Sequence, residues 1–159
     1  MKYYLAYGSN LNIPQMKYRC PNATIVGTSV IPDYELLFKG SKTGSYLTIE
    51  EKVGSVVPVA VWLVSQSDEA ALDRYEGYPR FYYKKEMPIT LDGAGPGFTA
   101  GLDAFVYIMH EDRPIGVPSK YYVRACLEGY DSFGFSHQFI EDAIERSKEG
   151  ADYEVSRMW

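Results

Sequence analysis

The first two thirds of the chain follow the pattern of β-strands. Runs of β-branched and aromatic residues are separated at short intervals by Gly, Pro, Asn and Asp, which are typical turn residues. The pattern predicts strands over residues 3–7, 23–30, 34–39, 46–50, 56–64, 81–91 and 100–108. The Gly-rich segment 92–99 is predicted to be a loop, and it lacks the spacing of a phosphate-binding motif.

Three further segments carry helix start and stop signals. Each begins at a serine that can act as an N-cap and runs to a glycine that can end a helix. The predicted N-caps are Ser67, Ser119 and Ser136, and the predicted ends are Gly77, Gly129 and Gly150. No repeat, linker or composition break divides the chain, so we expect a single domain over residues 1–159. The order of elements predicts an α+β fold, a small and mostly antiparallel β-barrel with flanking α-helices.

Composition and charge narrow the classes of partner. The 159 residues include 46% hydrophobic and 23% charged positions, which excludes a disordered or fibrous chain. A net charge of −5 and a pI near 5.1 argue against nucleic acid or an anionic membrane as a partner, because both require clustered positive charge. The N-terminus lacks the apolar stretch of a signal peptide, so we expect a cytoplasmic protein. The sequence leaves the oligomeric state open.

The residues that usually carry metal or nucleophilic chemistry do not form a known pattern. Cys20 and Cys126 are far apart and belong to no Cys-x-x-Cys motif. His110 and His137 lack the spacing of a zinc site. A hydrolase that used Ser9 or Cys126 would need a base that the sequence does not place. We therefore expect neither a metal nor a cofactor.

Glu76 stands out because of its position. It lies in the last turn of a predicted helix, where the negative end of the helix dipole disfavours a carboxylate. Leu72 and Tyr75 place it at the edge of the apolar face, so burial should also raise its pKa and make it a proton shuttle near neutral pH. The alternative is a structural glutamate that forms an ion pair with Arg74, Arg80 or Lys84.

The segment Tyr7-Gly8-Ser9-Asn10 follows the first predicted strand. A strand that ends at Gly-Ser-Asn exposes successive backbone amides, and such a turn can form a nest for an anion such as a carboxylate. By itself this segment is equally compatible with an ordinary turn.

Three motifs together resemble those of the gamma-glutamylcyclotransferase-like family, also described as the AIG2-like or gamma-glutamylamine cyclotransferase superfamily. They are YLAYGSNL at residues 4–11, LDRYEGYP at residues 72–79 and PSKYY at residues 118–122. The resemblance implies a small β-barrel with flanking helices and an enzyme that releases 5-oxoproline from a γ-glutamyl amine or peptide. It also implies that Glu76 is the acid/base, and that the substrate is bound by Tyr7, Gly8, Ser9, Asn10 and Tyr122.

The implied reaction is consistent with the residues that the chain lacks. A γ-glutamyl compound carries its own nucleophile, the α-amine, which can reach the γ-carbonyl and close a five-membered ring. Neither an enzyme nucleophile nor a metal is then required. The sequence leaves the leaving amine or peptide undefined. It also leaves open a protein of another class, a non-catalytic module that binds a small ligand or a partner on the same fold.

Overall fold

The computed structural model describes residues 1–41, 44–92 and 102–157. Within these ranges the strands form one five-stranded sheet in the order β2-β3-β1-β5-β4. The strands are β1 Lys2–Ala6, β2 Thr24–Ser41, β3 Gly44–Val64, β4 Tyr82–Ile89 and β5 Leu102–Met109. β1 and β5 are parallel, whereas the other neighbouring strands are antiparallel. The short β1 therefore lies in the middle of the sheet, and its residues Leu5 and Ala6 are fully buried.

The α+β class and the mostly antiparallel pairing are confirmed, but the predicted barrel is not. β2 and β4 are the two edges of the sheet, so the sheet is open. The edges approach each other near Thr28, whose carbonyl accepts a hydrogen bond from the Asp92 N–H at 2.8 Å. No ladder joins β2 to β4 in the part of the chain that the structure describes. Of the predicted 92–99 loop, residues 93–99 lie outside the described residues.

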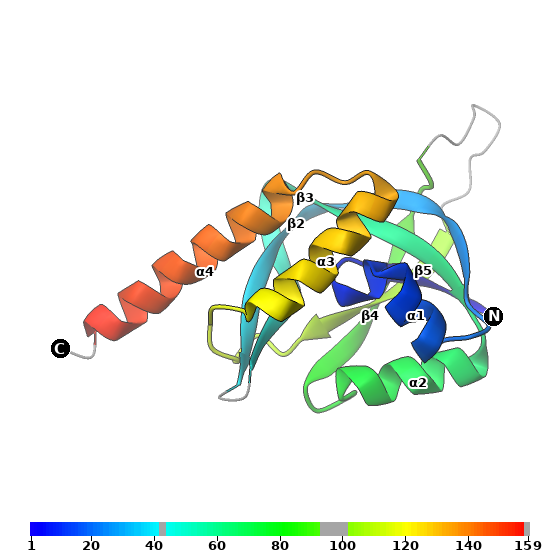
Figure 1. Cartoon of the computed structure of the whole chain (residues 1–159), viewed down its shortest axis with the longest axis horizontal. Helices are drawn as coiled ribbons and strands as arrows, with labels where there is room; N and C mark the ends of the chain where they lie inside the picture. Colours follow the sequence, from blue (N-terminus) through cyan, green and yellow to red (C-terminus); the bar gives the residue numbers. More distant parts are fainter. Residues whose placement is uncertain (42–43, 93–101, 158–159) are drawn as a thin grey trace.

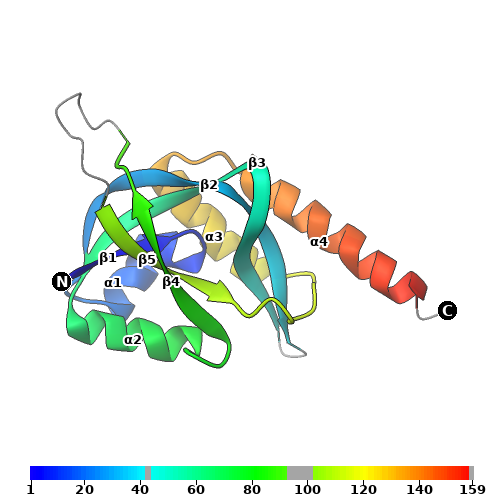
Figure 2. The same cartoon turned by 180° about the vertical axis from the view of Figure 1, so that it is seen from behind.

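The first hairpin corrects the strand boundaries. Segments 23–30 and 34–39, predicted as separate strands, are joined in β2, and segments 46–50 and 56–64 are joined in β3. Asp33 and Gly54 have positive φ angles of 59° and 90°, and the Gly54 N–H donates to Asp33 Oδ1 at 3.0 Å. Because these turn residues face each other across the pair, they bend both strands without ending them. Figures 1 and 2 show the resulting long, curved hairpin.

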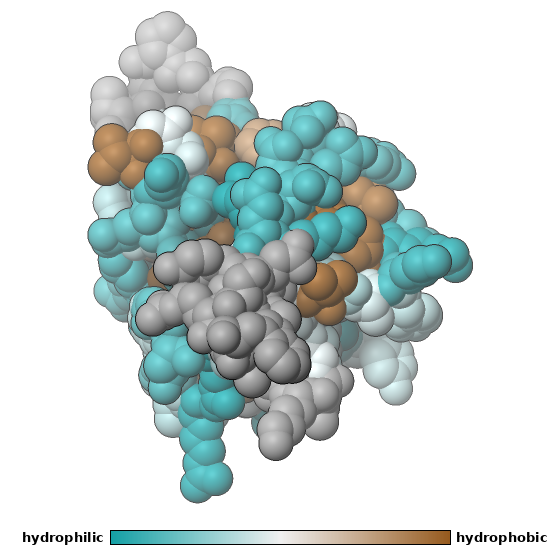
Figure 3. Space-filling view, turned by 90° about the vertical axis from the view of Figure 1, so that its left-hand side faces the viewer, coloured by the Kyte–Doolittle hydropathy of each residue, from teal (hydrophilic) through white to brown (hydrophobic). Residues whose placement is uncertain are grey.

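The helices are α1 Ile13–Arg19, α2 Gln66–Glu76, α3 Lys120–Phe133 and α4 Gln138–Arg157. A single 3-10 turn, η1 Ser9–Leu11, precedes α1. The sequence analysis predicted neither η1 nor α1. Figures 1 and 2 show α1 and α3 on one face of the sheet, α2 along one end of it, and α4 projecting away from it. On the side from which α4 projects, hydrophobic residues lie in small groups among hydrophilic ones (Figure 3).

The helix ends show which glycines act as caps. Gly77 ends α2 in the left-handed conformation, as predicted, whereas the N-cap of α2 is Ser65 and not Ser67. Ser119 caps α3, as predicted. The predicted end at Gly129 is wrong, because α3 continues to a left-handed cap at Gly134.

Close packing explains the glycines inside α3 and α4. A Cβ atom at Gly129 would lie 2.5 Å from the carbonyl carbon of Leu11, so α3 can press against η1 only with glycine there. The predicted end at Gly150 is also wrong, because α4 continues to Arg157. A Cβ atom at Gly150 would lie 2.8 Å from Ile115 Cδ1. No helix of the described segments is long and apolar enough to cross a membrane.

Candidate active site

The loop after β1 is held deep in the molecule. β1 ends at Ala6, Tyr7 and Gly8 follow, and the chain then forms the 3-10 turn. Ser9 and Asn10 are only 7% and 2% exposed. The hydrogen bonds that close the turn are donated by the amides of Leu11 and Asn12. The amides of Ser9 and Asn10 thus precede the first closed turn, which is where a helix start can bind an anion.

Glu76 is the last residue of α2 and faces this loop. Its Oε1 atom accepts a hydrogen bond from Asn10 Nδ2 at 3.4 Å. The side chain is partly exposed because it faces a cavity, but burial still raises the pKa of Glu76 to about 8, and the positive charge of Arg19 opposes the rise. The end of the helix dipole disfavours the charged form as well. The carboxyl group is therefore mostly protonated at neutral pH and ionised in a minority of molecules.

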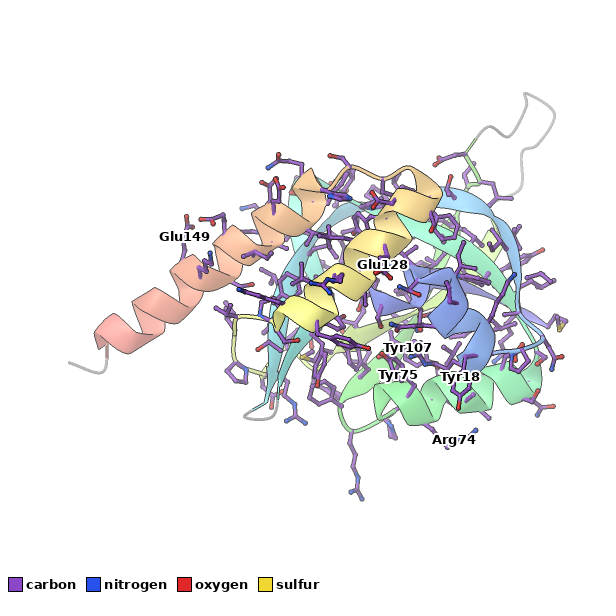
Figure 4. The ribbon with its side chains drawn as sticks, in the orientation of Figure 1. Tyr18, Arg74, Tyr75, Tyr107, Glu128 and Glu149 are labelled. Carbon is purple, nitrogen blue, oxygen red and sulfur yellow. The ribbon has the colours of Figure 1, made fainter. Side chains whose placement is uncertain are left out.

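The geometry does not support the alternative interpretation, in which Glu76 is a structural residue that forms an ion pair with Arg74, Arg80 or Lys84. Lys84 forms its ion pairs with Glu69 and Asp73 instead, both at 2.9 Å. Among the described residues, no ion pair joins Glu76 to Arg74, Arg80 or Lys84. Arg74 is exposed and is labelled below α2 in Figure 4, although part of it contributes to the lining of the cavity described below.

Three residues that the sequence analysis did not select complete this part of the site. Tyr4 accepts a hydrogen bond through its hydroxyl from Asn10 Nδ2 at 2.8 Å. The hydroxyl of Tyr75 lies 3.0 Å from Ser9 Oγ. Arg19 donates from Nη1 to Asn10 Oδ1, and its Cζ atom lies 3.4 Å from the centroid of the Tyr75 ring. The signal for Arg19 was the unpredicted helix α1, which Asn12 caps and which has a proline in its first turn.

Tyr122 closes the opposite wall. Its hydroxyl accepts a hydrogen bond from the Leu47 N–H at 3.1 Å, and a Cβ atom at Gly8 would lie 3.3 Å from that hydroxyl. A glycine at position 8 therefore leaves the space between the loop and Tyr122 open. The neighbouring Tyr121 is 79% exposed, so Tyr122 is the member of the pair that faces the loop.

These side chains surround one cavity of about 510 Å³. All six residues predicted for the site line it, together with several aromatic residues and the end of α2. The lining residues are Tyr4, Tyr7, Gly8, Ser9, Asn10, Tyr46, Leu47, Arg74, Tyr75, Glu76, Gly77, Phe81, Tyr82, Tyr107 and Tyr122. Figure 4 labels two of them, Tyr75 from α2 and Tyr107 from β5. The cavity thus joins a turn with amide donors to a carboxyl group that can both accept and donate a proton.

Most of the tyrosine hydroxyls around the cavity are already engaged. Tyr7 donates to the Tyr107 carbonyl at 2.6 Å, and Tyr82 donates to the Leu47 carbonyl at 2.8 Å. Burial raises the pKa of both tyrosines well above the usual value, so both stay neutral. In the described part of the chain, no group of three or more His, Cys, Asp or Glu side chains could hold a metal ion.

The sequence was compared with models of known protein families. Residues 4–124 match the family model described as gamma-glutamyl cyclotransferase, AIG2-like. The chain belongs to this family. The match contains the loop, α2 and Tyr122, and it ends within α3, so α4 lies outside the part that defines the AIG2-like cyclotransferase family.

Known proteins resemble this chain in part of its sequence or in its fold. The chain is 36% identical to the gamma-glutamylcyclotransferase of Bos taurus over 81 residues, which are 46% of this chain and 43% of the bovine protein. A solved gamma-glutamyl cyclotransferase has the same fold, with a TM-score of 0.77, 24% identity, and coverage of 89% of this chain and 85% of that one. A Homo sapiens protein described as uncharacterized gives a TM-score of 0.76 at 25% identity with the same coverage.

Proposed function

We propose that the protein is a cyclotransferase that releases 5-oxoproline from a γ-glutamyl amine or peptide. The observation that carries the proposal is the pairing of Glu76, with its raised pKa, and the Ser9–Asn10 turn in a single cavity. A non-catalytic binding role, the alternative, gives no reason for a carboxyl group that changes its protonation near neutral pH inside the cavity.

The turn would hold the α-carboxylate of the substrate. The amides of Ser9 and Asn10 precede the first closed turn of η1, and Gly8 has no side chain that would block them. This arrangement binds a carboxylate without an arginine. The same amides could also polarise the γ-carbonyl group as its oxygen becomes negative.

Glu76 would then act as base and acid in turn. Its carboxylate accepts a proton from the α-ammonium group, and the free amine attacks the γ-carbonyl carbon to form the C–N bond of the five-membered ring. The C–N bond to the leaving amine breaks, and that nitrogen receives the proton from Glu76. The attacking nitrogen loses its second proton as the ring forms, and Glu76 passes this proton to the leaving amine as well. The products are therefore 5-oxoproline and the ammonium form of the amine, and no water is consumed. A pKa of about 8 allows Glu76 to perform both transfers near neutral pH.

The leaving group would lie on the aromatic side of the cavity. Tyr46 and Tyr122 are packed edge to face with their ring centroids 5.2 Å apart, and Phe81 lies 6.4 Å from Tyr46 in the same manner. Tyr46 is 37% exposed, so this side opens to solvent and a long leaving group could extend outward. The aromatic rings favour apolar atoms next to the scissile amide.

The test is mass-spectrometric detection of 5-oxoproline after incubation with a γ-glutamyl alkylamine, a γ-glutamyl dipeptide and glutathione. A glutaryl alkylamide is the matched control, because it has the same amide but no α-amine and should release nothing. Glu76→Gln should lower kcat by about 10²- to 10⁴-fold, the usual loss for general acid/base catalysis. Absence of 5-oxoproline with every γ-glutamyl compound, or near wild-type kcat in Glu76→Gln, would contradict the proposal.

A further inference from the structure

Arg19 makes two contacts that tie α1 to the site. Its guanidinium group donates a hydrogen bond to Asn10 Oδ1. Its Cζ atom lies over the ring of Tyr75, 3.4 Å from the ring centroid. Tyr75 in turn lies within hydrogen-bond distance of Ser9, at 3.0 Å between Oγ and the hydroxyl. Arg19 therefore contacts both the loop and the helix that ends at Glu76.

The side-chain amide of Asn10 has two different ends. Arg19 can only donate hydrogen bonds, so the end that faces it must be the oxygen. The Tyr4 hydroxyl can donate or accept, so it is compatible with either end. An ionised Glu76 can only accept, so it requires the nitrogen end, which lies 3.4 Å away. Arg19 therefore fixes the Asn10 amide with its oxygen toward the guanidinium group and its nitrogen toward Glu76. This is also the orientation that a charged Glu76 needs.

We propose that Arg19 is a positioning residue that holds the Asn10 amide with its nitrogen toward Glu76 and so keeps a proton acceptor available in the cavity. The role of Arg19 in catalysis rests on the proposed function, whereas its effect on Glu76 does not. Without Arg19 the Asn10 amide can rotate and turn its oxygen toward Glu76. The rotated amide disfavours the carboxylate and favours the protonated acid, which can donate to that oxygen.

The charge of Arg19 acts in the same direction as its hydrogen bond. It opposes the effect of burial on the pKa of Glu76. Besides Glu76 and Arg74, the titratable groups that line the cavity are tyrosines from the surrounding elements: Tyr4, Tyr7, Tyr46, Tyr75, Tyr82, Tyr107 and Tyr122. Burial raises the pKa of five of them, so these carry no charge at neutral pH: Tyr4, Tyr7, Tyr82, Tyr107 and Tyr122. Arg19 itself is not one of the cavity-lining residues, and the cation among them is the exposed Arg74.

The experiment is a titration of Glu76 that needs no substrate. Protein labelled with ¹³C at the glutamate carboxyl is titrated by NMR, and the Glu76→Gln variant assigns the signal. Arg19→Met should raise the pKa of Glu76 by about one unit, because a nearby opposite charge usually shifts a carboxyl pKa by about 1–3 units. Lys17→Met is the matched control: Lys17 lies in the same last turn of α1 and is exposed, and its loss should leave the pKa unchanged.

Enzyme kinetics provide the second readout. In Arg19→Met the rise of kcat/KM with pH should move to higher pH, as the NMR titration of Glu76 does. Arg19→Lys keeps a charged hydrogen-bond donor, so its Glu76 pKa and its pH profile should be close to those of the wild type. Arg19→Gln replaces Arg19→Met if the latter does not fold. An unchanged Glu76 titration in Arg19→Met, or an equal rise in Arg19→Lys, would overturn the inference. A wild-type protein that releases no 5-oxoproline would overturn the proposed function alone, because the titration does not depend on turnover.

Discussion

Asn10 Nδ2 lies 3.4 Å from Glu76 Oε1, although the two residues are 66 positions apart in the chain. The contact joins the loop after the central strand to the last residue of α2. A substrate held by the loop would therefore have its reacting amine close to the only carboxyl group among the cavity-lining residues. The neutral amide of Asn10 can stabilise the carboxylate without fully neutralising it, so Glu76 remains able to take up a proton.

The rate of 5-oxoproline release should follow the protonation of this pair. Glu76 must be ionised to accept the first proton, so kcat/KM should rise with pH toward a midpoint near its pKa of about 8, well above the roughly 4.3 of an ordinary glutamate. The substrate amine titrates in a similar range, so the midpoint belongs to both groups. Comparison of the full pH–rate profile with the NMR titration of Glu76 in the free protein separates them. A profile that is flat from pH 5 to 9 would contradict the assignment.

The same pKa has a consequence for folding. Because Glu76 binds its proton more tightly in the folded state, the unfolded state ionises first, and the free energy of unfolding falls as pH rises from about 4.3 to about 8. Glu76→Gln should remove this loss. We expect the variant and the wild type to have similar stability near pH 4, and the variant to be more stable at pH 8 by at least about 1 kcal/mol, because each unit of pKa shift corresponds to about 1.36 kcal/mol. Urea denaturation at the two pH values measures the difference.

If the difference in unfolding free energy between Glu76→Gln and the wild type is the same at pH 4 and at pH 8, then Glu76 has an ordinary pKa in the folded state. Glu128→Gln is the control for glutamine substitution as such. Glu128 lies in α3 and accepts a hydrogen bond from Asn12 Nδ2 at 3.0 Å, outside the cavity. Its variant measures the effect of replacing a carboxylate by an amide away from the cavity.

The sequence was sufficient to predict the parts of the site that depend on local signals. Gly77 follows a helical apolar pattern and ends α2 as expected, which places Glu76 at the helix terminus. The Tyr7–Asn10 motif follows a strand and forms a turn, as predicted. Both predictions use residues within one or two turns of the site, so tertiary packing has little opportunity to override them.

Long-range packing explains what could not be predicted. Gly129 has the sequence signature of a helix end, but it lies inside α3 because Leu11 approaches it from a segment far away in the chain. Gly54 also looks like a strand end, yet its partner Asp33 on the facing strand turns the irregularity into a bend. Arg19 could not be assigned to the site because its position depends on how α1 packs against α2.

Binding of the substrate carboxylate should depend on the backbone of the loop more than on its side chains. Gly8→Pro requires a φ near −65°, whereas Gly8 has a φ of −125°. The substitution should therefore turn the following Ser9 and Asn10 amides away from the cavity, and the variant should lose measurable binding. Ser9→Ala removes only the contact with the Tyr75 hydroxyl at 3.0 Å and should weaken binding by less than about tenfold, since one hydrogen bond contributes about 0.5–1.5 kcal/mol. Calorimetric titration with the substrate in the Glu76→Gln background gives both affinities. Equal losses in the two variants would argue against backbone recognition.

Activity should not depend on thiols or on metal ions. Cys20 and Cys126 are both buried, and burial raises their pKa values to about 11 and about 12, so neither is a reactive thiolate at neutral pH. We expect iodoacetamide to leave the native enzyme active and unlabelled, while the same treatment in denaturant labels both cysteines. EDTA should have no effect either. Inactivation by EDTA that a divalent metal reverses would reject the proposed mechanism.

Tyr122 and Tyr121 provide a matched pair for testing the far wall of the cavity. The Tyr122 hydroxyl accepts from the Leu47 N–H at 3.1 Å, while the Tyr82 hydroxyl donates to the Leu47 carbonyl at 2.8 Å. The peptide groups of Leu47 are thus held by two tyrosines. Tyr122→Phe would leave a buried N–H without its acceptor, which costs about 1–3 kcal/mol of unfolding free energy.

Tyr121→Phe removes only a hydroxyl group, and the Tyr121 side chain is 79% exposed. This variant should therefore keep the stability and the kinetic constants of the wild type. If Leu47 shifts once its N–H is released, the space facing Gly8 changes shape, so Tyr122→Phe should also raise KM more than it lowers kcat. Urea denaturation and initial rates on the two variants measure both effects. Both substitutions remove one hydroxyl group, but only the Tyr122 ring faces the loop. If both variants show the same small changes in stability and kinetics, the Tyr122 hydroxyl neither supports Leu47 nor shapes the cavity.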